Sequence, residues 1–247
     1  MAHRSPVGPT VPGDSVRDVP DADLQPPHRR RITSNAVGIG LATGAYGLSF
    51  GAISVASGLT ALQTQSLSLL MFTGGSQFAL VGVLGAGGGA VAAVLTAWLL
   101  GARNSMYALS MAPPLQVAGL RRLAAAELTI DESTAMALAH PEPSAAARHA
   151  FWSTGLSVYV LWNIGTLLGA LGAAAIGDPA TLGLDAAIPA AFIALLWPRL
   201  VDRTMRAVAA AGAAVALVLT PVLRPGLPVL AAGLVALVAS ALIGRRS

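Results

Sequence analysis

Seven long runs of apolar residues follow one another along the chain, separated by short polar connections. A helix needs about 20 predominantly apolar residues to cross the hydrocarbon core of a bilayer, and each run comes close to this length or exceeds it. One sizeable polar connection, at about 113–148, separates the third run from the fourth. The pattern predicts an all-α fold, a polytopic transmembrane helical bundle. The apolar segments are roughly 34–58, 62–84, 89–112, 149–176, 182–200, 204–222 and 227–243.

The sequence before residue 32 has a different character. Residues 1–31 are rich in Pro and Arg and show almost no apolar periodicity, so we expect a disordered N-terminal tail. Residues 32–247 then form the transmembrane domain. We do not expect a secretory signal, because the next apolar stretch is too long and further apolar segments follow it at once.

The composition favours lipid as the solvent for much of the surface. Of 247 residues, 55% are hydrophobic and 11% are charged, whereas a soluble domain carries about 25% charged residues. The 15 basic residues are all Arg and lie mostly between apolar runs. They are therefore interpreted as topology signals, and no nucleic-acid partner is expected.

Several kinds of chemistry are missing from the sequence. There is no cysteine, no GxxxxGK[ST] phosphate loop and no histidine in the interior of an apolar run. No paired nucleophile and base, and no acidic residue at the centre of a span, can be recognised. We therefore expect neither an enzyme nor a bound cofactor or metal, and no proton relay of the usual kind.

The arginine positions also predict orientation, because positively charged loops favour the cytoplasm. If all seven segments cross once, the connections at 113–148 and 199–206 share an Arg-rich side with the C-terminus, which is then cytoplasmic. The cluster Arg29–Arg31 would lie outside, although it also prefers the cytoplasm. Both preferences are met if 34–112 crosses an even number of times, as with one re-entrant or broken helix. The side of the N-terminus stays open.

Small residues recur on one face of the first segment, at Gly40, Gly44 and Gly47 among others. Such a face lets another backbone approach closely, which is how membrane helices pack; a helix that borders a substrate path is the alternative. The fourth segment has a similar spacing at Gly165 and Gly169. Three segments separate the two, so a true repeat would be inverted, as in many transporters. In a chain so rich in glycine, chance similarity is an equal explanation.

The second segment is interrupted near its middle by Thr73-Gly74-Gly75-Ser76-Gln77-Phe78. Two adjacent glycines cost about 1 kcal/mol each in a helix. Irregular backbone at membrane depth is tolerated only where it is buried in protein or lines a cavity. Broken helices in transporters expose N–H and C=O groups to the substrate, so we predict a substrate site here. A tight helix crossing, with the glutamine bonded to a neighbour, is the alternative.

Arg103 lies inside the third segment, about ten residues before a Pro-Pro pair, or some 15 Å along a helix axis. A charge this deep costs at least about 2.5 kcal/mol and must be paired or face water. It could clamp a substrate carboxylate bidentately. Anchoring to carbonyl groups or to Gln77 is the alternative. Asn104 follows it directly, and Tyr107 and Ser110 continue the helical face of the arginine.

Two other polar groups are candidates. Asn163 shares a face of the fourth segment with Tyr159, where amides and hydroxyls can bond across helices. In the polar connection, Thr129 and Glu132 have the spacing of a capping box. Asp131 and Glu132 are alternatively a gating or coupling contact at the cytoplasmic mouth.

Taken together, these motifs resemble the AzlC (azaleucine-resistance) family of branched-chain amino acid permeases. The run from Phe72 to Ala79 is similar to the family's F-x-G-x-S-Q-F-A pattern, and Arg103-Asn104 through Pro113 is similar to its Arg-His…Tyr-x-x-Ser…Pro signature. The resemblance covers roughly 34–245. Asn104 is a departure, since family members often carry His, which puts any titration at this position in doubt.

The resemblance implies a secondary transporter that exports Leu, Ile and Val, with Met as a further candidate, across the bacterial cytoplasmic (inner) membrane. It also implies a partner, a small AzlD-like hydrophobic membrane subunit. A non-transporting scaffold or assembly subunit is the alternative. The residues predicted to bind the amino acid are Gly74, Gly75, Ser76, Gln77, Arg103, Asn104, Tyr107, Ser110 and Asn163, with Asp131 and Glu132 in gating or coupling.

Overall fold

The computed structural model describes residues 24–140, 144–176, 193, 196–197 and 200–244. The regular elements in these ranges are helices, which confirms the all-α prediction. The segment predicted at 182–200 lies largely outside the described residues. The helices are α1 (Pro26–Ala56), α2 (Ala61–Leu70), α3 (Gly75–Gly85), α4 (Ala90–Leu115), α5 (Leu120–Glu127), α6 (Asp131–Leu138), α7 (Ala145–Ile176), α9 (Arg203–Leu219) and α10 (Leu227–Gly244).

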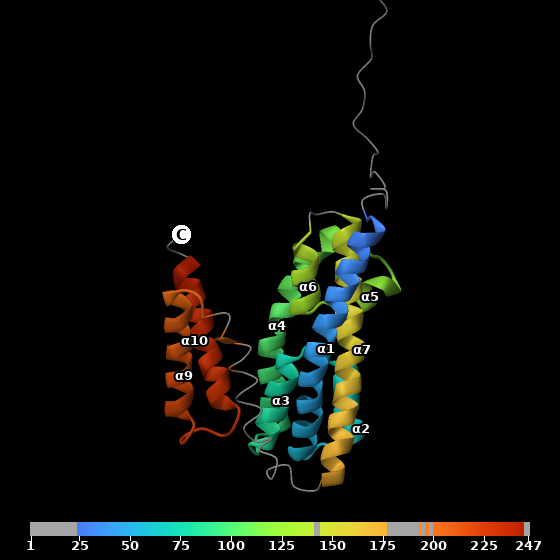
Figure 1. Cartoon of the computed structure of the whole chain (residues 1–247). Coiled ribbons are helices and arrows are strands. Elements are labelled where there is room, and N and C mark those ends of the chain that lie inside the picture. The colour runs from blue at the N-terminus through green and yellow to red at the C-terminus, as the bar shows by residue number, and fades with distance from the viewer. Residues whose placement is uncertain (1–23, 141–143, 177–192, 194–195, 198–199, 245–247) are drawn as a thin grey trace, which may run out of the picture.

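The two longest helices, α1 and α7, lie side by side along the length of the molecule (Figure 1). They contain 31 and 32 residues, so each extends for about 45–50 Å at 1.5 Å per residue. Within the described chain, Pro26–Ala56 and Ala145–Ala173 are the two helices long and apolar enough to be candidate membrane spans. The seven-span bundle expected from the sequence is therefore not confirmed.

Helices α1 and α7 pack backbone against backbone at their glycines. A methyl group at Gly44 would lie 2.9 Å from the carbonyl oxygen of Leu161, and one at Gly51 would collide with the carbonyl of Thr166. The prediction that the small residues serve close packing is confirmed. The residue numbers of the contacting pairs increase in the same direction along both helices, so α1 and α7 run parallel. The inverted relation that a true repeat would require is therefore not present between these two segments, which leaves chance similarity as the explanation of their glycine spacing.

The second predicted segment turns back on itself. Helices α2 and α3 meet at residues 71–74 and form a hairpin whose two ends lie at the same end of the bundle (Figure 1). Gly85, at the end of α3, lies against Ser57, just after α1: a methyl group there would be 2.6 Å from Ser57 Oγ. The expectation of a re-entrant or broken helix is confirmed. It explains why α1 and α7 are parallel, since α4 is the one long helix between them that runs back.

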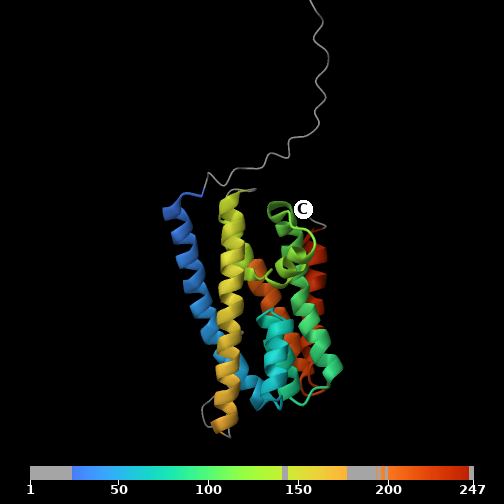
Figure 2. The same ribbon diagram turned by 90° about the vertical axis from the view of Figure 1, so that its right-hand side faces the viewer.

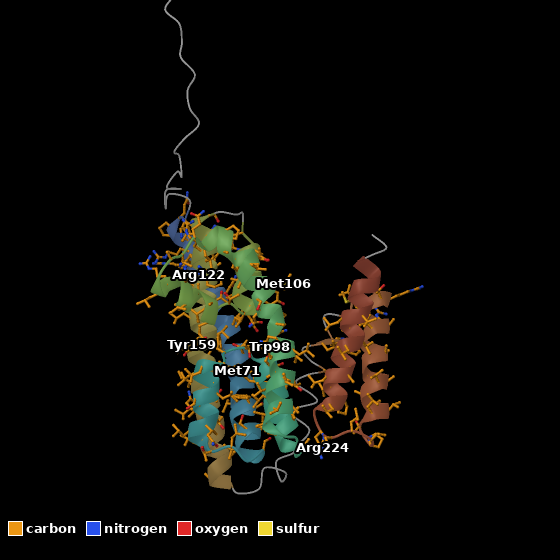
Figure 3. The ribbon with its side chains drawn as sticks, turned by 180° about the vertical axis from the view of Figure 1, so that it is seen from behind. Met71, Trp98, Met106, Arg122, Tyr159 and Arg224 are labelled. Atoms are coloured by element: carbon orange, nitrogen blue, oxygen red, sulfur yellow. The ribbon has the colours of Figure 1, made fainter. Side chains whose placement is uncertain are left out.

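This arrangement places the arginine clusters at one end. Arg29–Arg31 lie in the first two turns of α1, and Arg122 of α5 lies near the same end, whereas Arg224 lies at the opposite end (Figure 3). The predicted tail boundary at residue 31 is wrong, because α1 begins at Pro26. Proline is favoured in the first turn of a helix, so the helix starts within the Arg-rich part of the tail. Residues 1–23 lie outside the described residues.

Helices α5 and α6 pack against the end of the bundle where α4 finishes and α7 begins (Figure 2). Helices α9 and α10 form a hairpin, and Gly233 of α10 lies against Leu99 of α4. Many outward side chains are apolar; Leu62, Leu70 and Trp98 are 78%, 80% and 75% exposed. Apolar surface on this scale is unusual for a protein surrounded by water and suits contact with lipid.

Candidate functional site

One glycine and one glutamine shape the break between α2 and α3. Gly74 has φ +59° and ψ −93°, a backbone conformation that residues with a side chain rarely adopt. The fully buried Gln77 bridges the two half-helices. Its Oε1 accepts from Gly74 N–H at 3.2 Å, and its Nε2 donates to Leu67 O at 3.2 Å. Gln77 therefore has the structural role that the sequence left open as its alternative.

The break gives α3 an N-terminus inside the molecule. The first amides of a helix lack intrahelical acceptors, and the helix dipole makes this end attractive to an anion. The guanidinium group of Arg103 lies close by, because a methyl group at Gly75 would be 3.6 Å from Arg103 Nη2. Two sources of positive potential therefore converge at Gly75.

Arg103 pairs with the first residue of α6. Its Nη1 lies 2.9 Å from Asp131 Oδ2, and the two side chains are 35% and 24% exposed. Helix α6 begins here because the Ser133 hydroxyl accepts from Ile130 N–H at 3.1 Å and donates to Leu128 O at 2.6 Å. The ion pair therefore joins the middle of α4 to the start of α6.

The predicted capping box of Thr129 and Glu132 is wrong. Thr129 Oγ1 instead donates to Ala125 O at 2.6 Å, back into α5. The chain passes from α5 to α6 within three residues, so Ser133 takes the capping role. Asp131 and Glu132 both fall in the first turn of α6, where acidic side chains suit the helix dipole.

A cavity of about 140 Å³ lies among these groups, walled by five helices and the break. Its polar side chains come chiefly from α4 and α6, and its large apolar side chains come from the break, α3 and α7. The lining residues are Thr43, Tyr46, Phe72, Thr73, Gly74, Gly75, Phe78, Arg103, Asn104, Ile130, Asp131, Glu132, Val158 and Trp162.

An aromatic cluster fixes the apolar wall. Phe78 and Trp162 both pack on the buried Phe50, with ring centroids 5.5 and 5.9 Å away, and stand edge-to-face to one another at 6.1 Å. Such pairs contribute about 0.5–1.5 kcal/mol each beyond the burial of their area. This side of the cavity is therefore built from interlocked rings.

Some residues that line the cavity carry a buried polar atom with no hydrogen-bond partner among the residues that the structure describes. These atoms include Arg103 Nε, Asn104 Oδ1 and Trp162 Nε1. Buried polar groups are nearly always hydrogen-bonded, and leaving one unsatisfied costs about 1–3 kcal/mol. Two donors and one acceptor beside one small cavity are a set that a polar ligand could satisfy.

The structure brings together part of the predicted site. Gly74, Gly75, Arg103, Asn104, Asp131 and Glu132 line the cavity. The other predicted residues lie elsewhere. Gln77 bridges the two half-helices, as described above. Ser76 faces α4, since its Oγ would be 3.4 Å from a methyl group at Gly101.

Three more predicted residues do not line this cavity. Ser110 is exposed and its hydroxyl donates to the carbonyl of Met106, and Tyr107 is half-buried further along α4. Asn163 Oδ1 accepts from Gln65 Nε2 at 3.2 Å, and its Nδ2 donates to Tyr159 O at 2.8 Å. The amide of Asn163 therefore ties α2 to α7, as expected for a group that bonds across helices.

Sequence reasoning left open that the first segment borders a substrate path, but it did not single out the residues of α1 or of the apolar wall that line the cavity. Trp162 stands beside Asn163 and Phe72 directly before the predicted break, so proximity to polar motifs was the available signal. Thr43 and Tyr46 gave none, because their part of α1 reads as an ordinary apolar span.

Comparison with known proteins identifies one family. The family model described as AzlC protein matches residues 38–176, more than half of the chain. The matched region runs from α1 to the end of α7 and contains every residue that lines the cavity. No curated protein and no solved structure matches the chain.

Proposed function

Because the chain belongs to the AzlC family, which is associated with branched-chain amino acid transport across membranes, we propose that it is the large subunit of a branched-chain amino acid exporter. Its substrates are Leu, Ile and Val, with Met as a further candidate. It works in the bacterial inner membrane with a small AzlD-like hydrophobic subunit. The observation that carries the proposal is the cavity in which Arg103 meets the N-terminus of α3.

The cavity offers a separate place for each part of an amino acid. The carboxylate binds between Arg103 and the first amides of α3, where charge-assisted and helix-dipole interactions add together. The ammonium group faces the acidic pair Asp131 and Glu132 and the amide oxygen of Asn104. The aliphatic side chain packs on the aromatic wall.

The volume of the cavity supports a small apolar side chain. At about 140 Å³ it is close to an engineered protein cavity of about 150 Å³ that holds one benzene molecule. Branched aliphatic side chains are no larger than benzene, so one fits in this space. Binding a larger substrate would require the aromatic wall to move.

The ion pair of Arg103 with Asp131 acts as a gate in this proposal. The substrate carboxylate competes with Asp131 for the guanidinium group, so binding frees α6 from α4. Both side chains are partly exposed, and exposed pairs contribute only about 0–1 kcal/mol. A substrate can therefore exchange with this partner at low cost.

The proposed orientation follows the arginines. The positive-inside rule assigns the end that carries Arg29–Arg31 and Arg122 to the cytoplasm, together with the C-terminus. The first turn of α1 and the last turn of α10 both lie on that side (Figure 1). The hairpin of α2 and α3 then enters from the opposite face.

The test is reconstitution in liposomes of the chain, alone and with the candidate small subunit, followed by measurement of labelled leucine exchange. Arg103→Ala should reduce leucine binding at least tenfold, about 1.4 kcal/mol or more. The matched control Arg122→Ala, an exposed arginine of α5, should leave binding unchanged.

Two results would count against the proposal. Leucine exchange that is unaffected by Arg103→Ala removes the site assignment. No exchange by the chain with or without the small subunit favours the alternative, a non-transporting scaffold or assembly subunit.

A further inference from the structure

Glu127 places an acidic side chain next to the break between α2 and α3, outside the cavity lining. It is the last residue of α5, a short polar helix outside the predicted spans. Its carboxyl group lies near the backbone N–H of Phe72, and the Phe72 side chain lines the cavity. The polar connection between α4 and α7 therefore supplies an acidic group near the break, whereas none of the apolar segments carries one at its centre.

The environment of Glu127 favours its neutral form. One carboxyl oxygen, Oε1, is buried and has no hydrogen-bond partner within the described part of the chain. Burial raises the pKa of Glu127, and the N–H of Phe72 opposes this shift. Burying an unpaired carboxylate is costly, and burying the protonated acid costs less, so this site favours the protonated form more than water does.

Among the described residues, the titratable and charged groups that face Glu127 are few. From α7, Tyr159 is close enough to interact electrostatically with it, but the Tyr159 hydroxyl already donates to Leu69 O at 3.2 Å. The Tyr159 ring stands edge-on to Phe72 with centroids 5.0 Å apart. Figure 3 shows Tyr159 and Met71 at about the same height. On its own helix, Arg121 and Arg122 are exposed.

The other charged groups near the break form a separate set. Arg103 and Asp131 are paired with each other at 2.9 Å, and Asp131 and Glu132 line the cavity itself. Glu127 does not line the cavity; Phe72 does, and Glu127 meets it at the backbone. A change of charge on Glu127 therefore acts on residues 71–74, the hinge between the half-helices α2 and α3.

We propose that Glu127 is the proton carrier that couples amino acid export to a proton gradient, an inference that rests on the proposed function. The carboxylate takes one proton from water on the outer side, and the neutral acid releases it to water on the inner side. The O–H bond formed on Glu127 in the first step is the one broken in the second, so no other reactant is needed.

Coupling arises because the two charge states bind the hinge differently. The carboxylate holds the N–H of Phe72 by a charge-assisted interaction and requires contact with water. The neutral acid loosens this hold and tolerates burial. Each proton therefore shifts the balance between two positions of the half-helices, which carry Phe72, Gly74 and Gly75 of the binding site.

The experiment compares wild-type protein with Glu127→Gln in liposomes, with the small subunit where exchange requires it. Two rates of labelled leucine transport are measured, exchange with leucine on both sides and no gradient, and accumulation driven by an imposed pH gradient. The amide mimics the neutral acid but cannot give up a proton. Glu127→Gln should retain exchange within about threefold and lose gradient-driven accumulation at least tenfold.

Two further variants complete the design. Glu127→Asp keeps a titratable group and should restore part of the gradient-driven accumulation. Asp202→Asn makes the same carboxyl-to-amide change at the exposed cap of α9 and should leave both rates unchanged.

Each outcome separates the two proposals. Gradient-driven accumulation by Glu127→Gln at the wild-type rate overturns the coupling role. Loss of both rates in Glu127→Gln and Glu127→Asp, with folded protein by size-exclusion chromatography, assigns a structural role instead. Wild-type protein that exchanges leucine without responding to pH refutes proton coupling alone, whereas absence of any exchange refutes the transport function.

Discussion

The conformation of Gly74 provides a sharp test of the broken helix. With φ +59° and ψ −93°, the residue occupies a region essentially closed to residues with a Cβ. A methyl group at this position would meet nothing within 4 Å. Any loss of stability in Gly74→Ala must therefore come from the backbone and not from a collision.

The expected magnitude follows from that conformation. Backbone held in such a region costs about 1–3 kcal/mol for a residue other than glycine. For a chain of this size, 1 kcal/mol shifts Tm by about 2–4 °C, so Gly74→Ala should lower Tm by about 2–12 °C. Thermal unfolding of the detergent-solubilised protein, followed by intrinsic tryptophan fluorescence, measures the shift.

The neighbouring glycine is the matched control. Gly75 is the first residue of α3, and the nearest group to a methyl there is Arg103 Nη2 at 3.6 Å, an ordinary contact. Alanine is favoured over glycine in a helix by up to about 1 kcal/mol, so Gly75→Ala should leave Tm unchanged or raise it. Equal Tm values for the two variants, or a more stable Gly74→Ala, would refute the geometry of the break.

Three other predictions concern stability in the same assay. Gln77→Ala leaves the N–H of Gly74 without its partner and should cost about 1–3 kcal/mol, more than Gln63→Ala, which removes an exposed cap of α2; a reversed order would contradict the bridge. Gly47→Ala would place a methyl group 2.6 Å from Trp162 O and should cost about 1–3 kcal/mol by overpacking. Gly38→Ala on the same helix meets nothing within 4 Å and should not destabilise, so similar losses in both variants would argue against the α1–α7 contact. Because burial raises the pKa of Glu127 above its ordinary value of 4.5, its contribution to stability is fully present below pH 4.5 and is lost as pH rises through the raised value. Wild-type Tm should therefore fall relative to that of Glu127→Gln as pH increases above 4.5, and a constant difference would be evidence against burial of this carboxyl group.

The position of the break was predictable because its cause is local. Two glycines beside a hydroxyl and an amide weaken a helix wherever they stand, so Gly74 and Gly75 marked it directly. The direction of the chain after the break is not local, because a glycine hinge permits many angles. The conflict between the N-terminal arginines and the other Arg-rich connections gave the one sequence signal for a return.

The composition of the cavity depends on tertiary packing and could be predicted only in part. Arg103 stood out because a charge within an apolar run is costly, and its pairing with Asp131 joins two residues that were singled out separately. Trp162 and Tyr46 carry no such mark, since aromatic residues are common in apolar spans. Glu127 was overlooked because a carboxylate in a polar connection normally faces water.

In the proposed transporter, the return of α2 and α3 would also set the length of the path that the amino acid travels. The two half-helices contain 10 and 11 residues, or about 15–17 Å each, roughly half of the 30 Å hydrocarbon thickness of a bilayer. An amino acid held at the tip of the hairpin is thus separated from the far face by one short pair of helices. A shift of that pair alone would open the cavity to the far face. The close packing of α1 against α7 at their glycines would stay unchanged.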